Sequence, residues 1–111
     1  MQRRTLSRLM VILGLVGTAH AQGTFPAKPI RVIVPYAAGG VVDVQTRAVT
    51  IRMAEDLGQP IVVEAKPGAN ANIAAEMVAR SPADGYTILV TAPFFINNPM
   101  LASNLRWTQA D

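Results

Sequence analysis

The sequence predicts an α/β fold with an open, mainly parallel sheet. Three apolar segments, at residues 30–34, 61–63 and 86–90, alternate with two segments of helical spacing, which gives the order β-α-β-α-β. The third segment is almost unbroken, as is typical of a strand buried on both faces of a parallel sheet. Gly39-Gly40 separates the first strand from the first helix. With right-handed crossovers, such a sheet binds ligands at the carboxyl ends of its strands.

The first strand and the first helix have clear boundaries. Residues 30–34 run up to Pro35, and helical spacing then continues to a glycine at Gly58. We expect Asp43 to be the N-cap, because its side chain can accept a hydrogen bond from a free amide of the first turn. We expect Gly58 to end the helix. The apolar residues at helical spacing are Val44, Ala48, Ile51, Ala54 and Leu57.

The second half of the pattern repeats this alternation. Residues 61–63 are predicted as the second strand, and a loop leads from there into a second helix that ends before Pro82. Either Asn70 or Asn72 is expected to cap this helix. A turn with Asp84-Gly85 then precedes the third strand.

Residues 1–21 have the pattern of a secretory signal peptide. Arginines at the start are followed by an apolar stretch at 9–16 and by Ala19-His20-Ala21, after which cleavage is expected. The stretch is shorter than the roughly 20 residues of a spanning helix, so we expect no stable membrane insertion after cleavage. Residues 22–111 would form one small domain or part of one. Arg3-Arg4 leaves both the general and the twin-arginine export routes open.

The charges of residues 22–111 argue against a nucleic-acid partner. Seven lysines and arginines balance seven aspartates and glutamates in this part of the chain. The basic residues are scattered singly, without a stripe or interleaved aromatic residues that would follow a phosphate backbone.

The residue types also restrict the chemistry. The chain has no cysteine, and its single histidine, His20, belongs to the predicted signal peptide. Imidazole and thiol are the usual nucleophiles, bases and zinc ligands of enzymes. We therefore expect no metal site, no cofactor and no enzymatic activity.

The segments at the predicted strand ends, 36–40 and 91–98, are the candidate binding loops. Glycines let a ligand approach the backbone, and free amides at a helix start attract an anion. A tight turn that only allows close helix packing explains Gly39-Gly40 equally well. Asn97-Asn98-Pro99 fits either a set of ligand-binding carboxamides or an ordinary turn. Nucleotide-binding motifs are absent from the sequence.

Several sequence blocks are more specific together than any one of them alone. The blocks are Pro29 to Gly40 with Asp43, Asp56 to Glu64, Lys66-Pro67-Gly68-Ala69, Asn72 to Glu76, Pro82 to Leu89 and Ile96-Asn97-Asn98-Pro99. Together they resemble the Bug family, the substrate-binding proteins of tripartite tricarboxylate transporters. The resemblance covers essentially all of residues 22–111.

The resemblance implies part of the first lobe of a periplasmic, type II-like two-lobed binding protein, with the rest of that lobe and the second lobe absent. It implies a small carboxylated solute as ligand and membrane transporter subunits of the tripartite tricarboxylate type as partners. Two departures stand out: Asn70-Ala71 replaces a Gly-Gly, and Ala92-Pro93-Phe94 replaces a glycine with a hydroxyl residue. The implied ligand-binding residues are Tyr36, Ala38, Gly39, Gly40, Asp43, Thr91, Ala92 and Asn97.

Two other interpretations remain open from the sequence. One is a truncated gene product without independent function. The other is a small enzyme domain that holds a phosphorylated substrate at the glycine turn, with Asp43 or Glu64 as acid or base. The sequence does not identify the solute or the cognate transporter, and it does not separate uptake from sensing.

Overall fold

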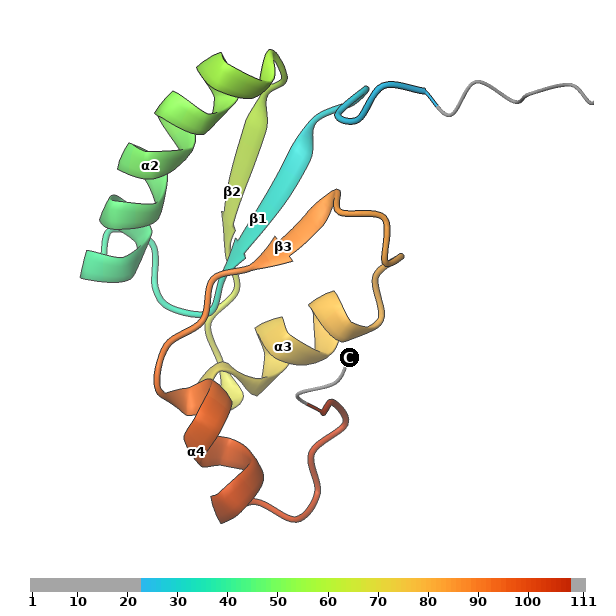
Figure 1. The fold of residues 1–111 in the computed structure, drawn as a ribbon. Helices are drawn as coiled ribbons and strands as arrows, with labels where there is room; N and C mark the ends of the chain where they lie inside the picture. Colours follow the sequence, from blue (N-terminus) through green and yellow to red (C-terminus); the bar gives the residue numbers. More distant parts are fainter. Residues whose placement is uncertain (1–22, 109–111) are drawn as a thin grey trace, which may run out of the picture.

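The computed structural model describes residues 23–108, so the predicted signal peptide, residues 1–21, lies outside the described part. Two helical crossover connections join three strands (Figure 1). The elements are β1 (Ile30–Val34), α2 (Val41–Leu57), β2 (Ile61–Ala65), the short helix η2 (Ala69–Ala71), α3 (Asn72–Ala79), β3 (Thr87–Leu89) and α4 (Phe94–Leu101).

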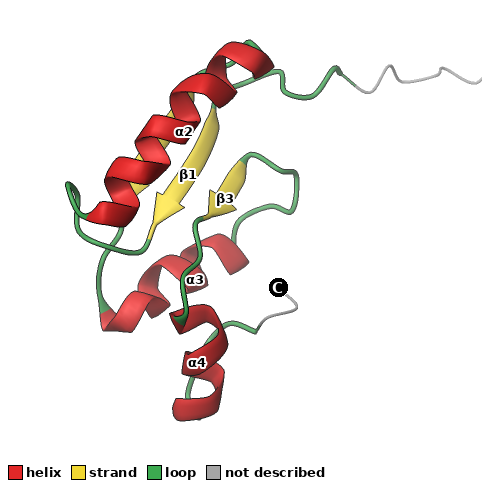
Figure 2. Ribbon diagram, turned by 60° about the vertical axis from the view of Figure 1, so that its left-hand side comes forward, coloured by secondary structure: helices red, strands yellow, loops and turns green. Residues whose placement is uncertain are grey.

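The three strands form one parallel sheet in the order β2-β1-β3. This confirms the predicted α/β class and the parallel pairing. Ile88 lies beside α2 residues and Leu89 beside α3 residues in two separate pockets. Because successive strand side chains point to opposite faces, α2 and α3 cover opposite faces of the sheet. Figure 2 shows α2 along the strands and α4 beyond the arrowheads of β1 and β3.

Helix α2 begins two residues before the predicted N-cap. Its N-cap is Gly40, which makes no side-chain cap hydrogen bond, so the assignment of Asp43 as N-cap is wrong. Asp43 lies instead in the first helical turn. The C-cap is Gly58 with φ of 65°, as predicted.

The face of α2 that packs on the sheet is polar. Thr46 and Thr50 are buried, and their hydroxyls donate to helix carbonyls of Val42 and Arg47 at 2.7 and 3.0 Å. These bonds satisfy both hydroxyls inside the helix. The apolar positions Val44 and Ile51, which indicated the helix, are 56% and 66% exposed. Helical spacing therefore identified the helix but not its buried face.

The later elements differ from the prediction in three ways. Neither Asn70 nor Asn72 caps α3, whose N-cap is Ala71 without a side-chain bond. Strand β3 has only three residues, and Ile88 is 39% exposed, so within residues 23–108 it is not buried on both faces. Asn97-Asn98-Pro99 is not a turn but lies inside α4.

Burial is concentrated in two places. The central strand β1 supplies the first, because β2 and β3 flank it: Ile30, Val32, Ile33 and Val34 are at most 4% exposed. The second is a cluster of Ala71, Ala75, Phe94 and Trp107, against which Phe95 packs. The rings of Phe95 and Trp107 stack at 5.1 Å. The aromatic residues near the carboxyl terminus therefore pack against one another and against small residues of α3.

Among residues 23–108, no helix combines the length and apolarity needed to cross a membrane.

Candidate functional site

The parallel pairing brings three loops to one edge of the sheet. Val34 pairs with Ala65 and Ile33 with Leu89, so β1, β2 and β3 end side by side. The expectation that segments 36–40 and 91–98 follow strands at the same edge is thus confirmed. The loop between β2 and α3 joins them there.

Each of the three helices that follow these loops starts without a side-chain cap. The N-caps are Gly40, Ala71 and Pro93 for α2, α3 and α4, and none makes a side-chain cap bond. The first amides of a helix have no intrahelical acceptor and carry partial positive charge. The helix dipoles at this edge therefore favour a negatively charged group, although the Phe95 and Ile96 amides of α4 already donate to the carbonyls of Ala92 and Pro93.

The loop between β1 and α2 is braced by Asp43. Its Oδ2 accepts a hydrogen bond from the Gly39 amide at 2.9 Å and another from Arg47 Nε at 3.0 Å. Gly39 has φ of 81°, a conformation that glycine adopts without a Cβ clash. The Arg47 guanidinium, and after it the Gly39 amide, lower the pKa of Asp43. Asp43 therefore stays ionised and holds the glycine turn closed.

This brace changes which amides are free. Gly39 donates to Asp43, and the Gly40 amide donates to the carbonyl of Ala37 at 3.2 Å. Val44 donates to the Gly40 carbonyl as in a regular helix. The donors left for an anion are those of the first helical turn, residues 41–43, rather than the two glycine amides.

One carboxylate oxygen of Asp43 is left to accept a further hydrogen bond. The residue is 3% exposed, and its Oδ1 is buried without a hydrogen-bond partner among the described residues. A buried carboxylate oxygen is stabilised by a donor such as an ordered water. Because Asp43 lies in the first turn of α2, its side chain faces the glycine loop rather than the solvent.

Tyr36, another predicted ligand-binding residue of the first loop, is half-buried. Its ring meets Phe94 edge to face, with the centroids 6.2 Å apart. Tyr36 thus ties the first loop to the start of α4 by packing. Ala38 is exposed on the same loop.

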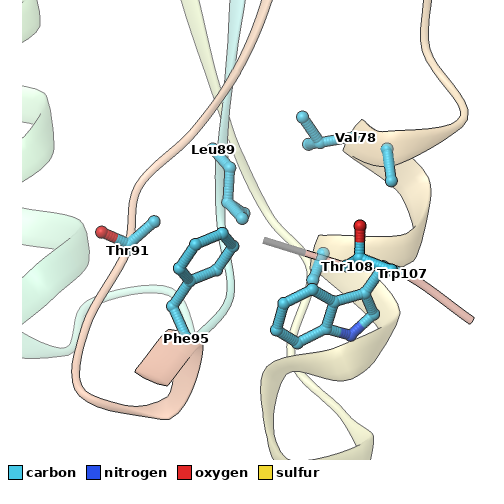
Figure 3. Close-up of a pocket in the computed structure, with 8 residues that line it drawn as sticks. Val78, Leu89, Thr91, Phe95, Trp107 and Thr108 are labelled. Carbon is cyan, nitrogen blue, oxygen red and sulfur yellow. The ribbon is translucent and has the colours of Figure 1, made fainter. Parts of the chain in front are cut away.

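Thr91 lines a pocket of about 180 Å³ on the α3 side of the sheet (Figure 3). Leu89, Phe95 and Trp107 supply much of its wall. The Thr91 hydroxyl points away from the Trp107 indole in Figure 3. The walls of this pocket suit an apolar group and not the anion that the helix starts favour.

The remaining two predicted residues lie on either side of the start of α4. Ala92 packs against the aromatic cluster, and its carbonyl accepts the Phe95 amide at 3.0 Å. Asn97 is exposed on α4. The structure therefore brings the predicted residues to one edge, but it shows packing at Tyr36 and Ala92.

The sequence analysis missed a network of asparagines at this edge. Asn98 is 2% exposed and bonds both Asn70 and Asn72, and Asn72 also accepts the indole N–H of Trp107. Asn70 and Asn72 had been interpreted as candidate helix caps, and Asn98 as part of a turn or a set of ligand-binding carboxamides. The sequence signal was the presence of four asparagines close to predicted loop ends, but it did not reveal that they pair.

Within residues 23–108 no group of three or more carboxylate, histidine or cysteine side chains is placed to hold a metal ion.

A parallel α/β unit with helix starts gathered at the carboxyl edge is typical of domains that bind a ligand at that edge. The chain belongs to the tripartite tricarboxylate transporter receptor family. Residues 45–111 match the profile described as "Tripartite tricarboxylate transporter family receptor". This agrees with the resemblance to the Bug family.

Two curated relatives come from Bordetella pertussis. A UPF0065 protein is 46% identical over 81 residues, which cover 73% of this chain and 25% of that protein. Protein BugT is 38% identical over 93 residues, which cover 78% of this chain and 28% of BugT. The chain thus spans about a quarter of the length of the curated relatives it matches.

Solved structures show the same fold. The periplasmic binding protein BugD has a TM-score of 0.69 and 40% identity, over 72% of this chain and 27% of BugD. MatC of Rhodopseudomonas palustris, with bound malate, has a TM-score of 0.66 and 35% identity, over 76% of this chain and 29% of MatC. An R. palustris protein with adipate has a TM-score of 0.62 and 37% identity, over 64% of this chain and 24% of that protein. The fold class of a periplasmic binding protein is therefore confirmed.

Proposed function

We propose that this chain is part of a periplasmic solute-binding protein that captures a small carboxylated organic acid and does not catalyse a reaction. The observation that carries the proposal is the gathering of three helix starts without side-chain caps at one sheet edge. A carboxylate bound there exchanges water for oriented amide dipoles. Malate and adipate, the ligands in two structures of relatives, are both dicarboxylates.

The proposed ligand-binding residues keep the predicted set with refined roles. The carboxylate lies against the amides that follow Gly39 and Gly40, Asp43 holds that loop, and Ala38 borders it. Tyr36 and Ala92 shape the site by packing. Thr91 offers a polar group from the loop before α4, and Asn97 offers one from α4 itself. We include in the proposal export after cleavage of residues 1–21 and delivery of the solute to membrane subunits of a tripartite tricarboxylate-type transporter.

In this proposal residues 22–111 supply one side of the binding cleft in the first lobe. The chain spans about a quarter of the length of its curated relatives, which supports this. Apolar side chains that are left exposed, such as Val41 at 73% and Leu101 at 81% exposure, support it as well. With one side open to water, the dipoles are screened. We expect affinity no better than about millimolar for this part alone.

A titration followed by NMR tests the proposal. L-malate added to the ¹⁵N-labelled protein is expected to shift the amides of residues 38–43 in a saturable way. Malamide, the neutral diamide of the same size, is the matched control and is expected to leave these amides in place. Equal shifts with both compounds, or shifts confined to the apolar pocket beside Trp107, would contradict carboxylate binding at this edge.

A further inference from the structure

The side-chain amide of Asn98 makes three hydrogen bonds at the sheet edge. Its Nδ2 donates to the Asn70 carbonyl at 2.8 Å and to Asn72 Oδ1 at 2.9 Å. Its Oδ1 accepts from Asn70 Nδ2 at 2.7 Å. Asn72 Oδ1 additionally accepts from Trp107 Nε1 at 3.1 Å. Four residues from three separate segments are thus joined in one connected network.

The loop that Asn98 holds has an unfavourable backbone. Ala69, Asn70 and Ala71 have φ of 47°, 52° and 69°, three consecutive residues with a Cβ in the left-handed region. Such a run persists only where surrounding contacts hold it. Asn70 contributes both its carbonyl and its side chain to Asn98, so the network is the contact that holds the centre of the run.

The network also fixes the third loop. Asn98 is one helical turn from the start of α4 at Phe94, and the Phe95 amide is bonded to the Ala92 carbonyl. Asn98 lies in the same helix as Phe94, so the bonds that hold Asn98 also restrain the start of α4. The network therefore ties the loop before α3 to the start of α4.

We propose that Asn98 and Asn70 are positioning residues for carboxylate binding, which lock the loop before α3 to α4 so that two of the three helix starts keep a fixed separation. The proposal rests on the function proposed above. Asn98 is buried and its side-chain amide is fully engaged, so it acts through the two segments that it joins and not by contact with the solute. Their effect is preorganisation: a site that is already ordered loses less entropy when the ligand binds.

Asn70→Gly separates positioning from overall stability. Glycine adopts a φ of 52° without strain, which compensates for the lost side-chain bond and for the added freedom of the unfolded chain. We expect a thermal midpoint close to that of the wild type. A purely structural Asn70 would then leave binding unchanged as well, whereas a positioning residue would not.

The experiment compares the wild type, Asn70→Gly, Asn98→Ala and the control Asn104→Ala, a change at an exposed asparagine outside the network. Malate affinity is measured by NMR titration, and hydrogen exchange is followed at the amides of residues 91–98. We expect about two- to tenfold weaker binding and faster exchange in Asn70→Gly, larger effects in Asn98→Ala, and neither effect in Asn104→Ala. Because Trp107 is the only tryptophan, its emission also reports any change that these variants cause near its bond to Asn72.

Wild-type affinity and exchange in a folded Asn70→Gly protein would overturn the proposal, even if Asn98→Ala does not fold. If the wild type binds neither malate nor adipate, the proposed function fails. The exchange data then still decide about the lock: faster exchange in Asn70→Gly supports it, and unchanged exchange overturns it.

Discussion

The loop before α2 and the loop before α3 solve the same problem in different ways. Both leave a parallel strand, need a left-handed backbone and enter a helix without a side-chain cap. The first uses a glycine and a charged brace, Asp43, only four residues away. The second uses three residues with a Cβ and a neutral network with Asn98, 28 residues away from Asn70. One loop is held locally and the other by tertiary structure.

The comparison predicts different sensitivities. A local ionic brace responds to pH, whereas an asparagine network has no titrating group. A glycine turn loses stability when a side chain is added, whereas a strained turn gains when one is removed. Each substitution below tests one of these differences.

Asp43→Asn is expected to have the largest effect of the three. The change removes the negative charge that pairs with Arg47 and weakens the bond to Gly39. Since the folded-state pKa of Asp43 is lowered, its contribution to stability is present above the ordinary aspartate pKa of about 4. That contribution is lost as the pH falls through the folded-state pKa. Denaturation curves should therefore show a deficit at neutral pH that disappears in acid.

Glu55→Gln is the matched control for this pH dependence. Glu55 lies on the same helix, but its pair with Arg52 has N···O of 3.4 Å and both side chains are more than 60% exposed. Such exposed pairs contribute little. A deficit of Asp43→Asn that persisted unchanged at low pH would show that the brace does not depend on ionisation.

The contrast between the loops also explains what the sequence predicted well. Strand β1, helix α2 and its C-cap Gly58 follow from local patterns. Asp43 was predicted as the N-cap, and its bonds to Gly39 and Arg47 were not predicted although both partners lie within four residues. The asparagine network was not predictable, because Asn98 bonds residues 26 and 28 positions away and no local pattern encodes these pairs.

Helix α4 shows the same limit. Pro99 follows Asn98, and local rules favour a turn at Asn-Pro. The tertiary bonds of Asn98 are available only when it is buried in a helix at this place. Likewise, the pairing of Tyr36 with Phe94 depends on the sheet and not on spacing in the sequence.

Gly39→Ala is expected to have an intermediate effect. A Cβ at Gly39 would meet no atom within 4 Å, so the penalty comes from φ of 81° alone and amounts to about 1–2 kcal/mol. Gly40→Ala is the control, because Gly40 has φ of −70° and only one close contact, with the Ala37 carbonyl at 3.2 Å. Urea denaturation should rank Gly39→Ala as the more destabilising change. The reverse order would mean that crowding, and not the left-handed backbone, requires glycine in this loop.

Ala69→Gly is expected to have the smallest effect, and one of opposite sign. Ala69 is exposed with φ of 47°, so glycine relieves strain without loss of packing, and the greater freedom of the unfolded chain offsets part of that gain. We expect the free energy of unfolding to rise by about 0.5 kcal/mol. Ala71→Gly should instead destabilise, because Ala71 is 4% exposed within the cluster of Phe94 and Trp107. If both changes destabilise equally, the loop before α3 stores no strain, and its difference from the glycine loop before α2 lies only in the partners that hold it.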